Sequence, residues 1–167
     1  VDNTDAAPAF QYVLGSSWTT GAASSHYGSN YFYCYEVSGT DEASATHRAR
    51  WTPTLPAGGN WDVYIWYANG TNRTTNSYWK IVNTGPAITE RVNQEQGGNG
   101  WTLLASDVPF NAGTSGYVEM GNNTGLTGTS QVVQGDAVKF VYKGSVGDTQ
   151  APSVPSGAAS SAASSGS

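Results

Sequence analysis

Hydrophobic and polar residues alternate over short stretches of this chain. The clearest case is the stretch 60–67, where one set of alternate positions holds Trp61, Val63, Ile65 and Tyr67 and the other holds Asp62, Tyr64 and Trp66. A period of two residues places the two sets on opposite faces of a β-strand. The stretch 44–51 alternates in the same way, with Ala49 and Trp51 on one face and Arg48 and Arg50 on the other. Both stretches therefore predict strands with one buried face.

Eight segments carry a strand pattern of this kind: 31–37, 44–51, 60–67, 77–83, 87–94, 101–106, 115–121 and 136–142. Clusters rich in Gly, Asn and Pro separate them, such as Ala57-Gly58-Gly59 and Gly97-Gly98-Asn99-Gly100. No segment repeats its apolar residues at the helical spacing. Short strands at regular spacing predict an all-β sandwich or barrel.

The pattern stops near residue 143. From 144 to 167 the chain is composed largely of Ser, Ala, Gly and Pro, which cannot bury a core. We expect a domain over 1–143 and a flexible linker over 144–167. Within this linker, the residues 148–155 resemble the lead-in to a fibronectin type III domain of bacterial secreted enzymes.

Composition removes several classes of function. The formal net charge of -5 argues against a nucleic-acid partner. No apolar stretch approaches the roughly 18 residues that a membrane-spanning helix requires, so no membrane partner is expected. The one cysteine, Cys34, allows neither an internal disulfide nor a cysteine metal site, and we expect it to be buried and inert.

Catalytic motifs do not stand out in the sequence. There is no Gly-x-Ser-x-Gly elbow and no His-Glu-x-x-His. A small hydrolase would require two carboxylates facing one bond, and no local pattern selects such a pair. His47 shares a strand face with Ala49 and Trp51, which favours a hydrogen-bonded core histidine over a catalytic base. The chain is expected not to be an enzyme.

Aromatic residues are the richest chemical resource, with 6 Trp and 10 Tyr. Sugars stack their C–H faces on such rings, and their hydroxyls pair with amides and guanidinium groups. Core packing is the better interpretation for Trp18, Trp51 and Trp61. The candidates for stacking on sugar are Tyr64, Trp66 and Trp79.

Polar candidates lie near these rings in the sequence. Contacts with anionic groups are assigned to Arg48, Arg50, Arg73 and Lys80, and contacts with sugar hydroxyls to Asn72, Asn76 and Gln94. The alternatives are surface ion pairs worth about 0–1 kcal/mol each and solvated turns. A structural Ca²⁺ held by Asp2, Asn3, Asp5 and Asp136 is a further alternative, but we favour hydrogen bonding within turns for these side chains.

Several strings together resemble the golvesin/xanthan lyase-type accessory domain. They include Ala49-Arg50-Trp51-Thr52-Pro53, Trp61-Asp62-Val63-Tyr64-Ile65-Trp66-Tyr67, Asn72-Arg73, Val92-Asn93-Gln94 and Gly135-Asp136-Ala137-Val138-Lys139-Phe140, in that order. The resemblance covers residues 1 to about 143. It implies an antiparallel β-sandwich of jelly-roll type and a carbohydrate-binding role, with xanthan suited to some members. It does not separate ligand contacts from fold contacts at Asn72 and Arg73. The acidic turn from Thr40 to Glu42 is a departure from the family.

Together these observations predict a non-catalytic carbohydrate-binding module. It would be secreted, extracellular and monomeric, would need no cofactor, and would hold a linked polysaccharide-degrading enzyme on an acidic polysaccharide such as xanthan. Catalytic and fibronectin-like domains are the expected covalent partners in the parent chain. The alternative from another class is a structural spacer or cell-surface adhesion domain without a sugar site.

Overall fold

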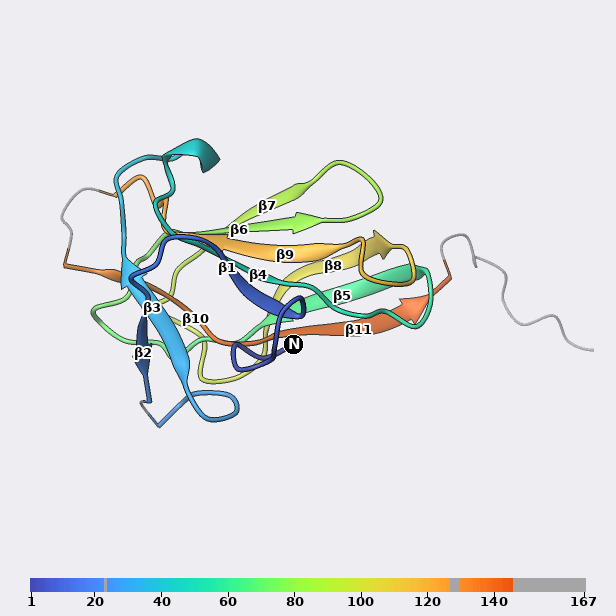
Figure 1. Cartoon of the computed structure of the whole chain (residues 1–167), viewed down its shortest axis with the longest axis horizontal. Helices are drawn as coiled ribbons and strands as arrows, with labels where there is room; N and C mark the ends of the chain where they lie inside the picture. Colours follow the sequence, from blue (N-terminus) through green and yellow to red (C-terminus); the bar gives the residue numbers. More distant parts are fainter. Residues whose placement is uncertain (23, 127–129, 146–167) are drawn as a thin grey trace, which may run out of the picture.

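The computed structural model describes residues 1–22, 24–126 and 130–145. These residues form three antiparallel sheets (Figure 1). The largest has the strand order β1 (Phe10–Leu14), β4 (Arg48–Trp51), β9 (Tyr117–Gly121), β6 (Ser77–Val82) and β7 (Ile88–Val92). The second has the order β10 (Val132–Gly135), β3 (Tyr31–Tyr35) and β2 (Thr19–Gly21). The third has the order β11 (Val138–Gly144), β5 (Gly59–Ile65) and β8 (Thr102–Phe110).

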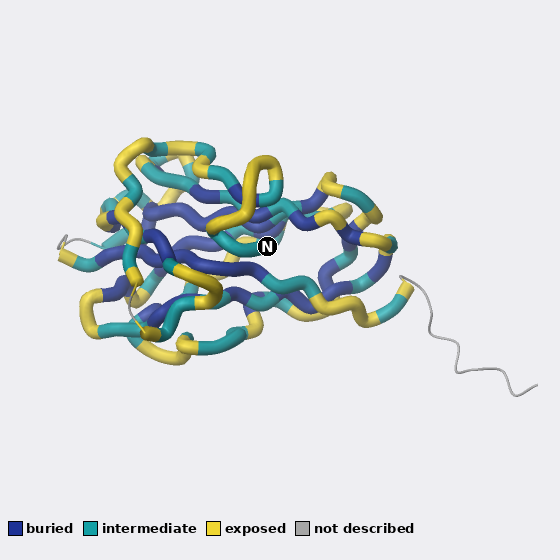
Figure 2. The backbone as a smooth tube through the Cα atoms, turned by 60° about the horizontal axis from the view of Figure 1, so that its bottom comes forward, coloured by how far each residue is buried: buried dark blue, intermediate teal, exposed yellow. Residues whose placement is uncertain are grey.

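The five-stranded sheet forms one layer, and its inner face packs on β5, β8 and β11. Ala49, Trp51, Trp79 and Met120 come from the first layer and Trp61, Val63 and Ile65 from the opposite one, and all belong to one apolar core. Trp51 and Trp79 stack with their ring centres 5.6 Å apart. Figure 2 shows buried strands through the middle of the domain and exposed loops around them. The predicted antiparallel β-sandwich is confirmed.

The predicted alternation of β5 is also confirmed. Val63 and Ile65 have no exposed area, whereas Tyr64 on the opposite face is partly exposed. Trp51 and Trp61 lie in the core as expected, and Trp18 packs against it while staying partly exposed. The thiol of Cys34 is buried, and this burial raises its pKa well above the usual range, which agrees with an inert side chain.

Three short strands were not predicted: β1, β2 and β10. They contain three to five residues each and lack a clear alternation of apolar and polar positions. The predicted strand 44–51 begins only at Arg48, because Glu42–Ser44 forms a turn of 3₁₀ helix. In contrast, β8 continues past its predicted end to Phe110 through a bulge. Asp107 there adopts a positive φ of 54° and donates its backbone N–H to Asp62 Oδ1.

Gly144 closes β11 rather than opening a linker. The predicted linker from residue 146 onward lies outside the described residues. Within the described part of the chain, no helix has both the length and the apolar character needed to cross a membrane.

Candidate functional site

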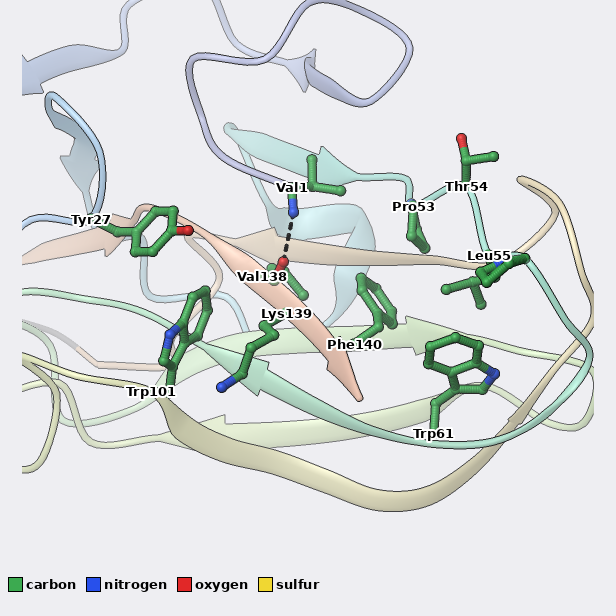
Figure 3. Close-up of a pocket in the computed structure, with 11 residues that line it drawn as sticks. Val1, Tyr27, Pro53, Thr54, Leu55, Trp61, Trp101, Val138, Lys139 and Phe140 are labelled. Carbon is green, nitrogen blue, oxygen red and sulfur yellow. Dashed lines mark hydrogen bonds between the residues drawn. The ribbon is translucent and has the colours of Figure 1, made fainter. Parts of the chain in front are cut away.

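A cleft of about 450 Å³ runs beside β11, the outermost strand of its sheet. Strand β11 pairs with β5 along one edge. On its other edge Val138 exchanges two backbone hydrogen bonds with Val1, and residues 53–56 line the cleft on that side. Pro53, Leu55, Trp61 and Phe140 line one end of the cleft, and Tyr27, Trp101 and Lys139 line the other (Figure 3). The lining side chains are therefore mostly aromatic and aliphatic, and Lys139 is the cationic side chain among them.

An aromatic cluster builds the Lys139 end of this cleft. The ring centre of Tyr27 lies 5.0 Å from that of Trp101 and 5.6 Å from that of Trp66, and the two tryptophans are 5.3 Å apart. The Trp66 indole N–H donates to the backbone carbonyl of Ser25 at 2.8 Å, which ties the loop bearing Tyr27 to the end of β5. Tyr27 is 42% exposed, so the cluster presents ring surface to solvent.

Lys139 lies over Trp101 of this cluster and over Tyr64 beside it. Its Nζ is 4.7 Å from the ring centre of Tyr64 and 4.7 Å from that of Trp101. The register of the sheet produces this arrangement, because Lys139 pairs with Tyr64 and Tyr64 pairs with Leu103 on the same outer face. Among the residues that the structure describes, no carboxylate lies within ion-pairing distance of Lys139. The site thus combines aromatic ring faces with an ammonium group that can pair with a carboxylate of a ligand.

Asp136 holds the loop of Tyr27 in place through a hydrogen bond to the loop backbone. Its Oδ2 accepts the backbone N–H of Tyr27 at 2.8 Å, and its backbone carbonyl accepts the indole N–H of Trp51 at 3.0 Å. Burial raises the pKa of the Asp136 carboxyl to about 7, the Tyr27 N–H opposes this rise, and the nearby Asp2 adds to it. This buried carboxyl joins the aromatic cluster to the core.

The four residues considered for Ca²⁺ make hydrogen bonds to neighbouring loops and turns, among them that of Asp136 to the Tyr27 N–H. Asp2 Oδ1 accepts the backbone N–H of Thr4, and Asp5 Oδ2 accepts that of Asp2. Asn3 contacts the side chain of Asn30. Within the described ranges, no three Asp, Glu, His or Cys side chains gather in a way that could hold a metal ion.

Of the three predicted stacking residues, Trp66 belongs to the aromatic cluster, and Tyr64 lies beside the cluster under Lys139. Trp79 does neither, because its strand face points inward. It has no exposed area, stacks on Trp51 and donates its indole N–H to Ser77 Oγ. Trp79 is a core residue here and offers no ring face to a ligand.

The predicted cations Arg48, Arg50 and Lys80 come together, but on the outer face of the five-stranded sheet. They are paired with carboxylates. Arg48 and Lys80 both contact Glu42 at 2.8 Å, and Arg50 contacts Glu119 at 2.6 Å. Because the sandwich separates the two layers, these cations and the aromatic cluster lie on opposite sides of the domain.

The remaining predicted contacts hold loops together. Arg73 is buried and donates to the carbonyl of Ala68, to Asn72 Oδ1 and to the hydroxyl of Tyr31. Gln94 is fully buried and bonds the backbone of Gln134. Asn76 donates its amide to the carbonyl of Thr124 at 2.6 Å. Of these residues, Asn72 is exposed and Asn76 partly exposed.

A second, smaller cleft of about 340 Å³ contains His47 and Ser17. Ser17 Oγ lies 3.2 Å from His47 Nε2, and Thr46 Oγ1 lies 3.0 Å from Nδ1. His47 is thus satisfied by hydrogen bonds, as predicted, but it is partly exposed rather than part of the core. A hydroxyl stands where a serine hydrolase would place a carboxylate, so this pair does not support the hydrolase alternative.

Sequence reasoning missed Tyr27, Trp101 and Lys139 as site residues. Trp101 follows a Gly-rich turn, and Lys139 alternates with Val138 and Phe140 on its strand, so a face could have been assigned to Lys139. Their proximity depends on the pairing of β11 with β5 and of β5 with β8, which brings together residues far apart in the chain.

Comparisons with known proteins give a consistent result. Residues 1–142 match the Golvesin C-terminal domain. The xanthan lyase of Bacillus sp. (strain GL1) is 28% identical over 144 residues, which is 86% of this chain but 14% of the lyase. This chain thus spans about one seventh of that relative.

Solved structures agree with this match. The structure of a Paenibacillus xanthan lyase superposes with a TM-score of 0.72 and 31% identity, covering 86% of this chain and 13% of the lyase. A family 35 carbohydrate-binding module from Clostridium thermocellum superposes with a TM-score of 0.52 and 19% identity, covering 81% of this chain and 93% of the module. At that identity the second likeness concerns the fold. The domain resembles a carbohydrate-binding module and a small segment of a lyase.

Proposed function

From the membership of this chain in the Golvesin C-terminal domain family, we propose that it is a non-catalytic carbohydrate-binding module of a secreted polysaccharide-degrading enzyme. Its ligand is an acidic polysaccharide of the xanthan type. The observation that carries this proposal is the aromatic cluster of Tyr27, Trp66 and Trp101 at the mouth of a cleft, with Lys139 above Trp101 and above the adjacent Tyr64.

Each part of the cleft suits a part of such a ligand. The C–H faces of a sugar ring stack on Tyr27 and Trp101. A uronate or pyruvyl carboxylate on the same sugar pairs with the Lys139 ammonium. The low dielectric around the rings strengthens this pairing relative to water. The cleft continues past Phe140 toward Trp61 and has room for a neighbouring sugar.

The module acts through proximity. A weak site on a linked domain raises the local concentration of substrate at the catalytic domain, so the whole enzyme gains avidity although the module itself performs no reaction. The small fraction of the xanthan lyases that this chain matches agrees with such an accessory role.

The test is affinity electrophoresis of the full chain in gels that contain xanthan, alginate, hyaluronan or galactomannan, with pull-down on insoluble cellulose and chitin. We expect retardation by the acidic polymers, which fades as salt is added. Trp101→Ala should weaken the retardation at least about tenfold, as removal of a central aromatic contact does. Tyr35→Ala is the matched control, because Tyr35 is a 65% exposed aromatic on β3 that does not line this cleft.

The outcomes separate the proposals. Equal retardation of wild type and Trp101→Ala would remove the cleft as the site. Retardation by neutral polymers alone would keep the module but reject the acidic ligand. No retardation by any polymer would favour the spacer or adhesion function.

A further inference from the structure

The acidic turn of residues 40–42 reaches over the outer face of the five-stranded sheet, where Glu42 contacts Arg48 and Lys80. Glu42, in its 3₁₀ helix, places one carboxylate between two cations. Oε1 accepts from Arg48 Nη1 at 2.8 Å, and Oε2 accepts from Lys80 Nζ at 2.8 Å. Arg48 belongs to β4 and Lys80 to β6, with β9 between them. Two strands that do not touch each other thus converge on a single carboxylate.

The outer face of this sheet carries more cationic than anionic side chains. Glu119 of β9 is the carboxylate built into this face, and it is bonded by Arg50 Nε at 2.8 Å and Nη2 at 2.6 Å. Arg48 approaches Glu119 only to 3.8 Å. Without Glu42, the cations Arg48, Arg50 and Lys80 would face the single negative charge of Glu119. The face would then attract an anion.

The turn that carries Glu42 is held mainly through its backbone. The carbonyl of Thr40 accepts from Arg91 at 2.9 Å and from Asn123 at 3.0 Å, and the carbonyl of Gly39 accepts from the N–H of Gly125. No residue of the 3₁₀ helix is buried. Glu42 is therefore free to leave its cations while the turn stays attached at its base.

The ion pairs of Glu42 are also weak enough to exchange. The side chains of Glu42, Arg48 and Lys80 are 34%, 28% and 21% exposed. Solvent screens ion pairs at this exposure, and each contributes little to stability. A carboxylate of a ligand can replace that of Glu42 between the same two cations with the same geometry.

We propose that Arg48 and Lys80 form a second binding site, for the carboxylate of an acidic sugar, and that Glu42 occupies it until the ligand displaces it. Tyr117, whose ring centre lies 3.9 Å from the Arg50 guanidinium carbon, provides a ring surface on the same face. This site lies on the opposite side of the sandwich from the cleft and does not depend on it. Two sites on one domain engage two segments of a polymer, and Glu42 sets the affinity of one of them.

The experiment uses the full chain and a short oligogalacturonate as the probe, with affinities measured by calorimetry. Glu42→Gln removes the competing charge and should bind the probe about 5- to 20-fold more tightly than wild type, in the range typical of coupling between competing contacts. Asp41→Asn is the matched control. It removes the same charge from the same turn, where the Asp41 side chain forms no cap hydrogen bond, and should change the affinity less than about twofold, as a screened surface charge does.

Further variants locate the effect. Adding Arg48→Gln and Lys80→Gln to Glu42→Gln should abolish the gain. The gain should persist in a Trp101→Ala background, in which the cleft is disabled, so failure of the second site and failure of the proposed function can be told apart. A Glu42→Gln protein that is folded by circular dichroism, yet binds no more tightly than Asp41→Asn, would overturn the proposal.

A measurement on the wild type covers the case in which the substitution disturbs the turn. Saturating oligogalacturonate should shift the NMR signal of the Glu42 carboxyl carbon, because that group is displaced from Arg48 and Lys80. The carboxyl signal of Glu90, which is exposed on β7 and lies outside the cation cluster, should stay in place. An unmoved Glu42 signal at saturation would contradict displacement.

Discussion

The side chain of Gln94 acts toward the backbone of Gln134 as a neighbouring strand would. Its Nε2 donates to the carbonyl of Gln134 at 2.6 Å, and its Oε1 accepts the Gln134 N–H at 3.0 Å. Both residues have no exposed area. A single amide thus satisfies both backbone groups of a residue in β10 that no water can reach.

Gln94→Ala should therefore destabilise the domain by about 3 kcal/mol, since it leaves a buried donor and a buried acceptor without partners. Urea unfolding followed by tryptophan fluorescence measures this change. Gln96→Ala, at an exposed position two residues away, should alter stability by less than about 0.5 kcal/mol. A similar loss in both variants would show that the loop, and not this amide, is the sensitive feature.

Arg73 is expected to stabilise the fold rather than to bind sugar. It donates to Ala68, Asn72 and Tyr31 from a buried position, so Arg73→Ala should cost about 2–3 kcal/mol in unfolding free energy. Arg73→Lys keeps the charge but loses the planar fork, and should be destabilised almost as much. Affinity for xanthan, measured below the melting temperature, should be unchanged in both. A selective loss of affinity in Arg73→Ala would return this residue to the ligand site.

Lys139 should decide between acidic and neutral ligands. Lys139→Gln is expected to lower the affinity for acidic polysaccharides about tenfold, the loss of one charge-assisted contact, and to flatten the dependence on salt. Lys139→Arg should retain most of the affinity. Affinity electrophoresis at several salt concentrations provides the measurement.

Lys143→Gln is the control for this charge. Lys143 is on the same strand but pairs with Asp62 at 3.4 Å, so its removal should leave the affinity nearly unchanged. An equal effect of both substitutions would mean that net charge alone, and not the position of Lys139 above the rings, attracts the polymer.

Asp136 should make stability depend on pH below neutrality. Its pKa is raised to about 7 in the folded state, so the folded protein holds a proton that the unfolded chain releases from about pH 4 upward. The unfolding free energy should consequently fall as pH rises from about 4 to about 7, by at most about 4 kcal/mol. Urea unfolding at several pH values, in EDTA so that no divalent cation holds the carboxylate ionised, measures the slope.

Asp136→Asn removes the titrating group while keeping an acceptor for the Tyr27 N–H. Its stability should be flatter than that of wild type across the same pH window. A variant with the unchanged slope would assign the pH dependence to another group.

Local pattern was sufficient for much of the fold. The alternation in 60–67 and in 48–51 predicted correctly which side chains enter the core, because burial of one strand face imposes a period of two. It failed for β2 and β10, since such short strands are held by pairing with β3 rather than by an apolar stripe of their own. Trp79 was wrongly predicted to contact a ligand for a related reason. Its strand 77–82 has large side chains on both faces, so the pattern did not show which face enters the core.

By itself, the sequence determined an all-β domain, the inward face of its clearest strands and a supply of aromatic rings. Only the tertiary structure decided which outer faces meet. A period of two assigns a residue to a side of its strand, but the partner strand depends on contacts between distant segments. Pairing of β11 with β5 placed Lys139 over Tyr64, whereas the order β4-β9-β6 placed Arg48 and Lys80 around Glu42 on the opposite layer. The predicted rings and the predicted cations were therefore separated by the core that both layers share.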